Sequence, residues 1–454
     1  MAFLDNRYLI GNATGLEIFA KIRELPVIDP HNHANLPEIA ANDCYRDAWQ
    51  LFAATDHYVW EMLRKCSVPE ELITGPASPE EKFLALGKVF PLIAGNPVYE
   101  WIHLDLKRYF GIEELLSEAT AGKIYKAVNE KLATDAYRPQ ALLTGVLNVE
   151  AMSSTDDLID TLEYHEQANA AIGRQLIRPT WRPDKAMKIF APTWREYIAK
   201  VEERFDMKIR HYSDLLEAMR RSHDYFAERG CRASDHGVDT LPAIDYEDAS
   251  HVFRKAINGK KLHADEIAGF MGAFLGEAAK LNAEKGWVMQ LHMGAVRDVR
   301  TKLFSALGPD VGGDVCDVYR DFLPGMVSLL NRFDDKLKAV FYCLDPNAQA
   351  TLASITRAFG DHAALGSAWW LNDTPVGMKR QLELISSIDL FSNFAGMVSD
   401  SRKLLSYGSR FEMFRRVLAD VLGAMVERGQ LPLSVAEMLA ERMAYSGPKK
   451  FWNL

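Results

Sequence analysis

Eight short apolar runs, separated by helical stretches, constrain the fold of this chain more than any other feature. The first run is Pro26-Val27-Ile28-Asp29. The others span residues 142–149, 175–180, 231–236, 287–292, 339–344, 363–369 and 394–400. Strands that alternate with helices pair in parallel through right-handed crossovers, so eight such units predict an α/β fold, a closed (β/α)8 TIM-type barrel. The alternative is an open doubly wound sheet, but no glycine-rich nucleotide fingerprint follows the first strand.

The stretch between the first two runs has a different pattern. Residues 36–140 are almost continuously helical, and Ser78-Pro79-Glu80-Glu81 marks one helix start with a capping hydroxyl, an N1 proline and an N3 glutamate. We therefore expect one barrel domain over residues 1–454 with a mainly helical insertion at 36–140. The segment from Ser406 onward should cover the bottom or side of the barrel, with its charges on a solvated face.

The composition limits the class of protein and its partners. Apolar residues make up 48% and charged residues 25% of the 454 positions, which is typical of globular proteins, and no apolar run is long enough for a membrane span. A net charge of −9 argues against a nucleic-acid or membrane partner. Five dispersed cysteines fit a reducing cytoplasm, and no signal-peptide pattern opens the chain, so we expect a cytoplasmic protein.

Polar side chains gather where the apolar runs end. His31 and His33 follow the first run and, being two positions apart on an extended backbone, point to the same side. Later runs end in or near Arg178 and Arg182, Asp235 and His236, His292 and Arg297, Asp345, Trp369 and Asp373, and Asp400 and Arg402. In a barrel the carboxyl ends of the strands share one rim, so these side chains should meet there.

Four of these residues form a candidate metal site: His31, His33, His292 and Asp400. Imidazole and carboxylate ligands together suit zinc or another divalent ion such as manganese, iron or cobalt. Singly, each has a structural explanation, since His292 could be a hydrogen-bonded core histidine and Asp400 a helix cap. Their common position at strand ends favours a site.

The histidine pair, the strand-five histidine and the strand-eight aspartate resemble the pattern of the amidohydrolase superfamily of metal-dependent barrels. Within it, the chain resembles the uronate isomerase (glucuronate isomerase) family along almost its whole length. The matching stretches are Asp56-His57-Tyr58-x-Trp60, Trp101-Ile102-His103-Leu104-x-Leu106-x-Arg108-Tyr109-Phe110-Gly111, Arg178-Pro179-Thr180-x-Arg182-Pro183-Asp184, Gly230-Cys231-Arg232-x-Ser234-Asp235-His236-Gly237, Gln290-Leu291-His292-x-Gly294-Ala295-x-Arg297, Gly366-Ser367-x-Trp369-Trp370-x-Asn372-Asp373 and Asp400-Ser401-Arg402.

The resemblance implies an aldose–ketose isomerase of hexuronate catabolism. It would interconvert D-glucuronate with D-fructuronate, and D-galacturonate with D-tagaturonate, by moving a proton from C2 to C1 through an enediol. It also implies one divalent metal ion, with zinc as the first choice, held by His31, His33 and Asp400. His292 would be a nearby ligand or hydrogen-bond partner.

The resemblance further assigns the proton transfers to a catalytic dyad, His57 and Tyr58. Adjacent helical residues do not share a face, so the dyad requires a loop or a helix end. A tyrosine also needs a neighbouring cation to act as a base near neutral pH. Asp400 is the competing base, and Arg402 would steady the negative charge of the enediolate.

Substrate binding calls for a partner to the C6 carboxylate. The planar fork of arginine suits a carboxylate, which makes Arg182 the first choice and Arg297 the second. Asp235 and Trp369 are expected to line the pocket. We expect a small-molecule hexuronate as the partner and a homo-oligomeric enzyme.

Three other functions remain open from the sequence. A hydrolase of the same superfamily would use His292 and Asp400 similarly but would not require several arginines around the pocket. A metal-dependent decarboxylase would release carbon dioxide. A catalytically inactive barrel would act only in binding or assembly.

Overall fold

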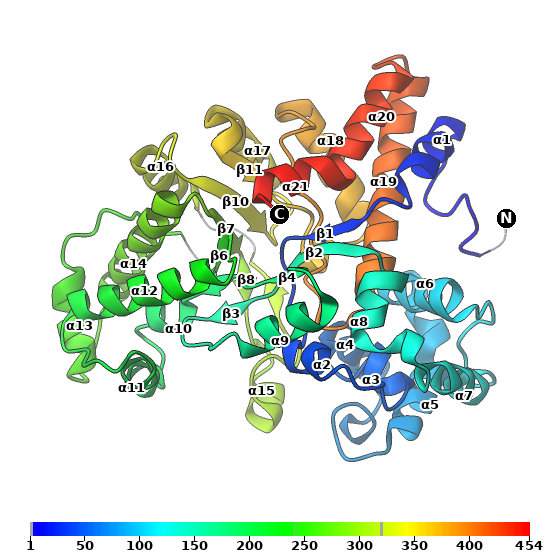
Figure 1. The fold of residues 1–454 in the computed structure, drawn as a ribbon, viewed down its shortest axis with the longest axis horizontal. Coiled ribbons are helices and arrows are strands. Elements are labelled where there is room, and N and C mark those ends of the chain that lie inside the picture. The colour runs from blue at the N-terminus through cyan, green and yellow to red at the C-terminus, as the bar shows by residue number, and fades with distance from the viewer. Residues whose placement is uncertain (1–2, 240, 318–320) are drawn as a thin grey trace.

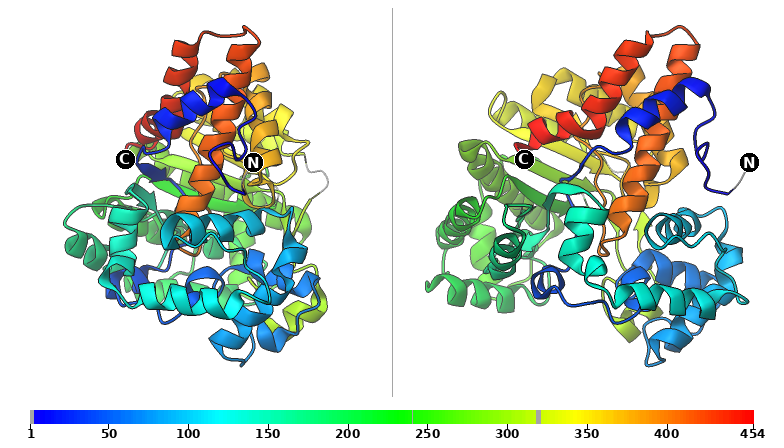
Figure 2. Two further views of the ribbon diagram at one scale, coloured as in Figure 1. Left: turned by 90° about the vertical axis from the view of Figure 1, so that its right-hand side faces the viewer. Right: turned by 45° about the vertical axis from the view of Figure 1, so that its right-hand side comes forward.

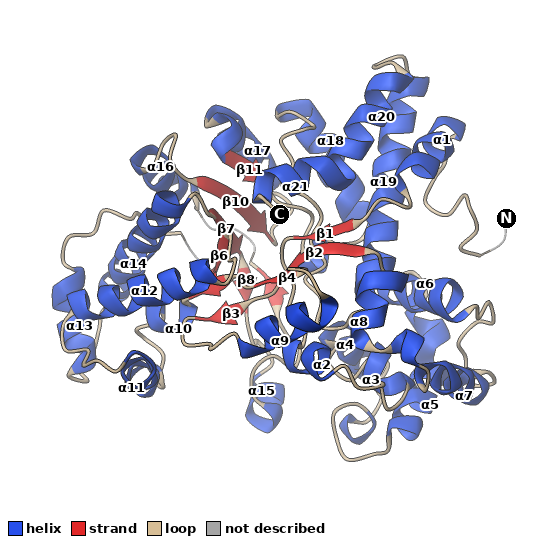
Figure 3. Cartoon of the chain, viewed as in Figure 1, coloured by secondary structure: helices blue, strands red, loops and turns tan. Residues whose placement is uncertain are grey.

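The computed structural model describes residues 3–239, 241–317 and 321–454, and its strands lie at the centre with helices around them (Figure 3). The strands are β1 (Val27–Asp29), β2 (Val149–Ser153), β3 (Asp156–Asp157), β4 (Ile177–Arg178), β5 (Trp181–Arg182), β6 (Ala233–Val238), β7 (Val288–Met293), β8 (Ala295–Val296), β9 (Val315–Cys316), β10 (Lys338–Cys343) and β11 (Ala363–Leu365). β8 and β9 form a separate antiparallel pair, and all other strand pairs are parallel.

The parallel strands fall into two sheets, and two segments of the chain contribute one strand to each sheet. One sheet has the order β1-β2-β4 and the other β11-β10-β7-β6-β5-β3. β2 continues into β3, and β4 into β5, so both sheets belong to one curved surface. Phe394 forms a parallel bridge with Leu365 of β11, and farther along the same segment Asp400 N–H donates to His31 O at 3.1 Å. Eight segments thus close a ring, which confirms the predicted barrel.

Three of the eight predicted strands differ from the structure. Residues Leu142–Val146 form a π-helical turn, and the strand begins only at Val149. A short apolar run does not distinguish a buried helix from a strand. The run 363–369 is a strand only to Leu365, and 394–400 pairs with its neighbour at one bridge. Gly396 and Asp400 have φ of 108° and 48°, and these positive angles interrupt an extended backbone.

Between β1 and β2 the described chain is helical. Its helices are α2 (Leu36–Ala41), α3 (Ala48–Phe52), α4 (His57–Lys65), α5 (Pro79–Val89), α6 (Pro97–Phe110), α7 (Ala121–Leu132) and α8 (Pro139–Ala141). α5 begins at Pro79, and Ser78 and Glu81 form the predicted capping box. These helices lie together at the lower right of Figure 1, on one side of the strands.

The remaining helices pack around the outside of the strands. They are α1 (Ala13–Ile22), α9 (Glu163–Ile172), α10 (Asp184–Met187), α11 (Trp194–Phe205), α12 (Tyr212–Glu228), α13 (Ala249–Ile257), α14 (Ala264–Lys285), α15 (Thr301–Leu307), α16 (Leu323–Arg332), α17 (Gln349–Ala358), α18 (Pro375–Ile388), α19 (Ser406–Glu427), α20 (Leu433–Glu441) and α21 (Gly447–Trp452). No helix among the described residues is both long enough and apolar enough to cross a bilayer.

The expectation of a solvated charged face after Ser406 is wrong for α19. This long helix lies between α1, α6 and α18, as the orange segment in Figure 2 shows. Arg410, Arg415 and Arg416 on it are buried. Their guanidinium groups donate to backbone carbonyls and carboxylates, for example from Arg416 to the Asn6 carbonyl at 3.0 Å. These contacts occupy part of the guanidinium donors, while Nε of Arg410 and Nε of Arg415 have no partner.

Candidate active site

The two early histidines and the late aspartate meet because their chain segments run side by side. His31 and His33 follow β1, and His33 N–H donates to Ser401 O at 2.9 Å. Asp400 and Ser401 follow the segment that bridges to β11. Asp235 lies in β6 and His292 in β7, two adjacent strands on another part of the ring. The structure therefore brings together residues from four separate chain segments.

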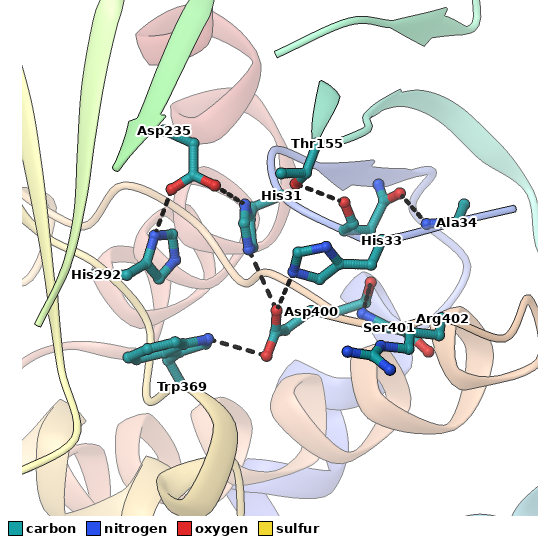
Figure 4. Close-up of polar contacts among 12 residues, drawn as sticks. His31, His33, Ala34, Thr155, Asp235, His292, Trp369, Asp400, Ser401 and Arg402 are labelled. Atoms are coloured by element: carbon teal, nitrogen blue, oxygen red, sulfur yellow. Dashed lines mark hydrogen bonds and ion pairs between the residues drawn. The ribbon is translucent and has the colours of Figure 1, made fainter. Parts of the chain in front are cut away.

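His31 is shared by two groups that could hold a metal ion, and Figure 4 shows it between two carboxylates. In the first group, Oδ1 of Asp400 lies 3.2 Å from Nε2 of His31 and 3.2 Å from Nε2 of His33. In the second, Asp235 Oδ1 lies 2.7 Å from His292 Nδ1, and Asp235 Oδ2 lies 3.8 Å from His31 Nδ1.

Charges across the site keep its carboxylates ionised. Burial opposes ionisation, but His31 and His33 hold the pKa of Asp400 well below its usual range. Arg182, with His292 and His31, does the same for the pKa of Asp235. Burial lowers the pKa of His292 to about 4, so this imidazole is neutral and offers a lone pair.

These residues fit a divalent metal ion. His31 Nδ1 and His292 Nε2 are buried without a hydrogen-bond partner, although buried polar atoms are normally satisfied. The donor set is imidazole nitrogen and carboxylate oxygen within 4.8 Å of one another, which suits a divalent first-row ion. The sequence grouped His292 with the other ligands; its Nδ1 is bonded to Asp235, so only Nε2 is free.

His57 and Tyr58 are the first two residues of α4, which is the helix-end position that the dyad requires. The Asp56 side chain caps this helix by accepting the Tyr58 backbone N–H at 3.0 Å. The rings of His57 and Tyr58 stack, with centroids 4.7 Å apart. Burial, together with the charge of Arg402, lowers the pKa of His57 to about 4.

The cation beside Tyr58 is Arg410 of α19, which the sequence analysis missed. Its guanidinium lies 4.7 Å from the centre of the Tyr58 ring and donates to Asp373 Oδ2 at 2.6 Å. Asp373 raises the pKa of Arg410, although burial opposes this. Burial raises the pKa of Asp373 to about 8 despite the nearby guanidinium, so the contact is a charge-assisted hydrogen bond from Arg410. Burial, with the charge of Asp373, still raises the pKa of Tyr58 well above its usual value. Asp373 ended a matching motif, but no local pattern marked Arg410 within its helix.

The three predicted arginines are in different situations. Arg182 pairs with Asp184 at 3.0 Å and Asp235 at 3.1 Å. The other two lie farther out, and the structure joins them through Asp310, which the sequence analysis also missed. Arg402 contacts Asp310 Oδ1 at 3.4 Å and Arg297 contacts it at 3.8 Å.

Trp369 and Trp370, which follow β11, border the same cluster. The Trp369 indole N–H donates to Asp400 Oδ2 at 2.9 Å, so this ring fixes the aspartate from the side opposite the histidines. Trp370 faces His57 edge-on, with centroids 5.8 Å apart, and Arg297 lies 4.8 Å over its ring. Trp370 therefore connects the insertion helix α4 with the outer arginine.

A glucuronate isomerase family model matches residues 1–452 of the chain. The chain belongs to the glucuronate isomerase family. A uronate isomerase of Thermotoga maritima is 46% identical over 450 residues, which cover 98% of this chain and 99% of that protein. The crystal structure of a Thermotoga maritima uronate isomerase superposes with a TM-score of 0.97, at 45% identity and full coverage of both chains. A glucuronate isomerase structure from Caulobacter crescentus gives 0.95 at 27% identity, covering 100% of this chain and 97% of that one.

The family assignment confirms the resemblance read from the sequence. It also confirms the prediction of an aldose–ketose isomerase that acts on a uronate.

Proposed function

We propose that the enzyme interconverts D-glucuronate with D-fructuronate, and D-galacturonate with D-tagaturonate. The observation that carries this proposal is the convergence of His31, His33 and Asp400 at one rim of the barrel, with Arg182 and Arg402 nearby. A hydrolase of the superfamily needs the first three groups but not the arginines. A uronate, in contrast, carries a carboxylate that an arginine can hold while the sugar carbons react.

The proposed metal ligands are His31, His33 and Asp400, and His292, whose Nε2 has no hydrogen-bond partner, would be a nearby ligand or hydrogen-bond partner. Zinc is the first choice because it accepts imidazole and carboxylate ligands, and manganese, iron and cobalt share that donor set. A divalent ion held here supplies positive charge that stabilises negative charge developing on a substrate oxygen.

We assign Asp400 as the base that removes the carbon-bound proton, because its carboxylate stays ionised and can accept a proton. It would take the proton from C2 and return it to C1 on the same face of the enediol. The resemblance read from the sequence favours the His57–Tyr58 dyad for this step. With its pKa raised by burial, however, the Tyr58 hydroxyl keeps its proton and is better suited to exchange protons between the C2 and C1 oxygens.

The proton count then balances without a co-reactant. The C2 carbon loses one proton to Asp400, and the C1 oxygen gains one from Tyr58. The C2 oxygen afterwards returns a proton to Tyr58 while C1 takes the proton from Asp400. Arg402 contacts Asp310, which also lies near His33 and His57, so its guanidinium is close to the site and would stabilise the enediolate.

For the C6 carboxylate we retain Arg182, with Arg297 as the second choice. Asp184 and Asp235 orient the Arg182 guanidinium, and 21% of the side chain stays exposed. Orientation by two carboxylates reduces the conformational entropy that substrate binding would otherwise remove. Arg297, at 43% exposed, is held less firmly.

We further propose that residues 1–454 form one domain, in which the insertion at 36–140 closes one side of the substrate pocket. The insertion supplies His57 and Tyr58, and its helix α4 is tied to the loop after β8. Glu61 Oε1 accepts the Gly313 N–H at 2.7 Å, and Arg64 donates to the Val311 carbonyl. All five cysteines are free thiols, which supports a reducing cytoplasm, and we retain the homo-oligomer as part of this proposal.

The test of the function is an assay of ketose formation from each uronate in deuterium oxide. We expect ketose that carries solvent deuterium at C1, with the aldose exchanging deuterium at C2 in the reverse direction. A hydrolase would form no ketose, a decarboxylase would release carbon dioxide, and a binding protein would do neither. Ketose formed from neither uronate by the metal-loaded enzyme would contradict the proposal.

A further inference from the structure

A cavity of about 450 Å³ lies at the other end of β1 from the metal cluster. Val27, the first residue of β1, and Asn148, which precedes β2, form part of its floor. α6 and the buried helix α19 supply its walls. Its place at the amino ends of the strands separates it from the proposed active site, which occupies the carboxyl ends.

The charged side chains around this cavity carry an excess of positive charge. They are Arg23, Arg108, Arg415, Arg416, Glu24 and Glu412. Glu412 binds both Arg108, at 2.8 Å, and Arg416, at 2.9 Å, and Glu24 pairs with Arg23 at 3.2 Å. Four guanidinium groups against two carboxylates leave two positive charges without a counterion in the lining.

Arg415 is the least compensated of the four guanidinium groups. Its side chain is 5% exposed, and it makes no ion pair with a carboxylate among the described residues. Two of its nitrogens donate to the backbone carbonyls of Arg23, at 3.0 Å, and Pro26, at 2.8 Å, while Nε has no partner. Burial lowers the pKa of Arg415 to about 10.

A purely structural role does not account for all of these features. The Arg23 carbonyl at the end of α1 and the Pro26 carbonyl before β1 offset part of the Arg415 charge. They leave Nε unsatisfied, however, and they do not explain why a cavity is kept next to a buried cation. Buried charges are ordinarily paired, because an unpaired charge in a low-dielectric interior is strongly unfavourable.

We propose that the cavity binds a small organic dianion, either a dicarboxylate or a phosphate ester. Two negative charges match the excess of the lining, and the volume lies within the range of small-molecule sites. A carboxylate or phosphate oxygen can accept charge-assisted hydrogen bonds from the guanidinium groups of the lining. A uronate carries only one carboxylate and matches the two excess positive charges of the lining less well. The cavity is therefore expected to bind a different class of ligand from the active site.

Arg23 and Glu24 allow a matched test at the mouth of the cavity. Their side chains are 55% and 84% exposed, so neither substitution should disturb the fold. Binding of succinate and of inorganic phosphate to the full-length enzyme is measured by titration calorimetry. We expect Arg23→Gln to weaken binding by about fivefold and Glu24→Gln to tighten it by about threefold. Arg415→Lys, which keeps a charge but removes the guanidinium fork, should weaken binding by at least about tenfold.

The two probes also identify which class of dianion the cavity binds. Binding of succinate alone indicates a dicarboxylate, binding of phosphate alone indicates a phosphate ester, and either result supports the site. Two results overturn it: no binding of either probe at about 10 mM, or binding that is unchanged in the Arg23 and Glu24 variants and lost in Arg182→Ala. The second result would place the anion in the active site. If Arg415→Lys fails to fold, binding to the Arg23→Gln and Glu24→Gln variants still tests the site.

Discussion

His31 and Asp400 are separated by 369 positions in the chain, yet Nε2 of the histidine lies 3.2 Å from Oδ1 of the aspartate. The contact exists because the first and last strand segments of the barrel are neighbours, with Asp400 N–H bonded to the His31 carbonyl. Trp369 holds the other carboxylate oxygen. One aspartate oxygen therefore faces the histidines while the other is fixed by the wall of the site.

Removing the charge of Asp400 should abolish turnover. Asp400→Asn keeps the size of the side chain but loses both the proposed proton acceptor and an anionic metal ligand, so we expect kcat to fall by at least about 10³-fold. The measurement is ketose formation together with the metal content of the purified variant. Asp361→Asn, at a carboxylate that is 99% exposed, is the matched control. A variant of Asp400 with near-normal kcat would remove this residue from the chemistry.

Arg182→Ala should act mainly on substrate binding. Loss of a charge-assisted contact to the C6 carboxylate should raise KM by about tenfold or more, with a smaller change in kcat. Arg178→Ala is the control, since Arg178 lies four positions earlier and donates to the Gly230 carbonyl outside the cluster. An unchanged KM in steady-state kinetics would indicate that Arg297, and not Arg182, contacts the C6 carboxylate.

The buried pair of Arg410 and Asp373 should couple strongly in stability. The two side chains are 1% and 2% exposed, and removing one leaves the other buried without the partner of its 2.6 Å contact. We expect Arg410→Met to lower the free energy of unfolding by about 3–5 kcal/mol, and the double variant Arg410→Met/Asp373→Leu to recover part of that loss. Urea unfolding of the two single variants and the double variant measures the coupling. Strictly additive changes would show that the pair is not a unit.

His103 should make the folded enzyme less stable in mild acid. Its Nδ1–H donates to the Tyr99 carbonyl at 2.9 Å, and its Nε2 accepts the Leu116 N–H at 3.0 Å, which only a neutral ring can do. Burial lowers the pKa of His103 to about 4. The unfolded chain binds the proton near pH 6.5, so this contribution is present above that pH and is lost as the pH falls towards 4. The loss is on the order of 3 kcal/mol.

The measurement is the urea midpoint at several pH values between these limits. In His103→Gln the midpoint should depend less steeply on pH than in the unmodified enzyme. His251→Gln, at an exposed histidine, is the control and should keep the original slope. Equal slopes in all three proteins would assign the acid sensitivity to other groups.

The barrel could be predicted because buried parallel strands leave a repeated signal. Apolar runs such as Val288–Met293 and Lys338–Cys343 lie near the predicted positions, and polar residues follow them at one rim. The errors arose where the signal is weakest. Residues 142–146 are apolar but helical, and glycine and left-handed angles shorten the last strand segment.

The site residues that the sequence analysis missed share a physical cause. Arg410 lies in an amphipathic helix where arginine is ordinarily solvated, and Asp310 lies in the loop between α15 and β9, away from the strands of the barrel. Only the packing of α19 against α6 and α18 brings Arg410 over Tyr58. Contacts of this kind depend on tertiary structure, which neither periodicity nor motif spacing encodes locally.

The most direct test of the proposed centre is an anomalous difference map from crystals of the active enzyme, collected at the absorption edge of the metal found by elemental analysis. We expect a peak within about 2.0–2.2 Å of His31, His33 and Asp400. No peak at these three side chains in crystals of fully active enzyme, or a peak bound elsewhere, would contradict the metal site on which the mechanism depends.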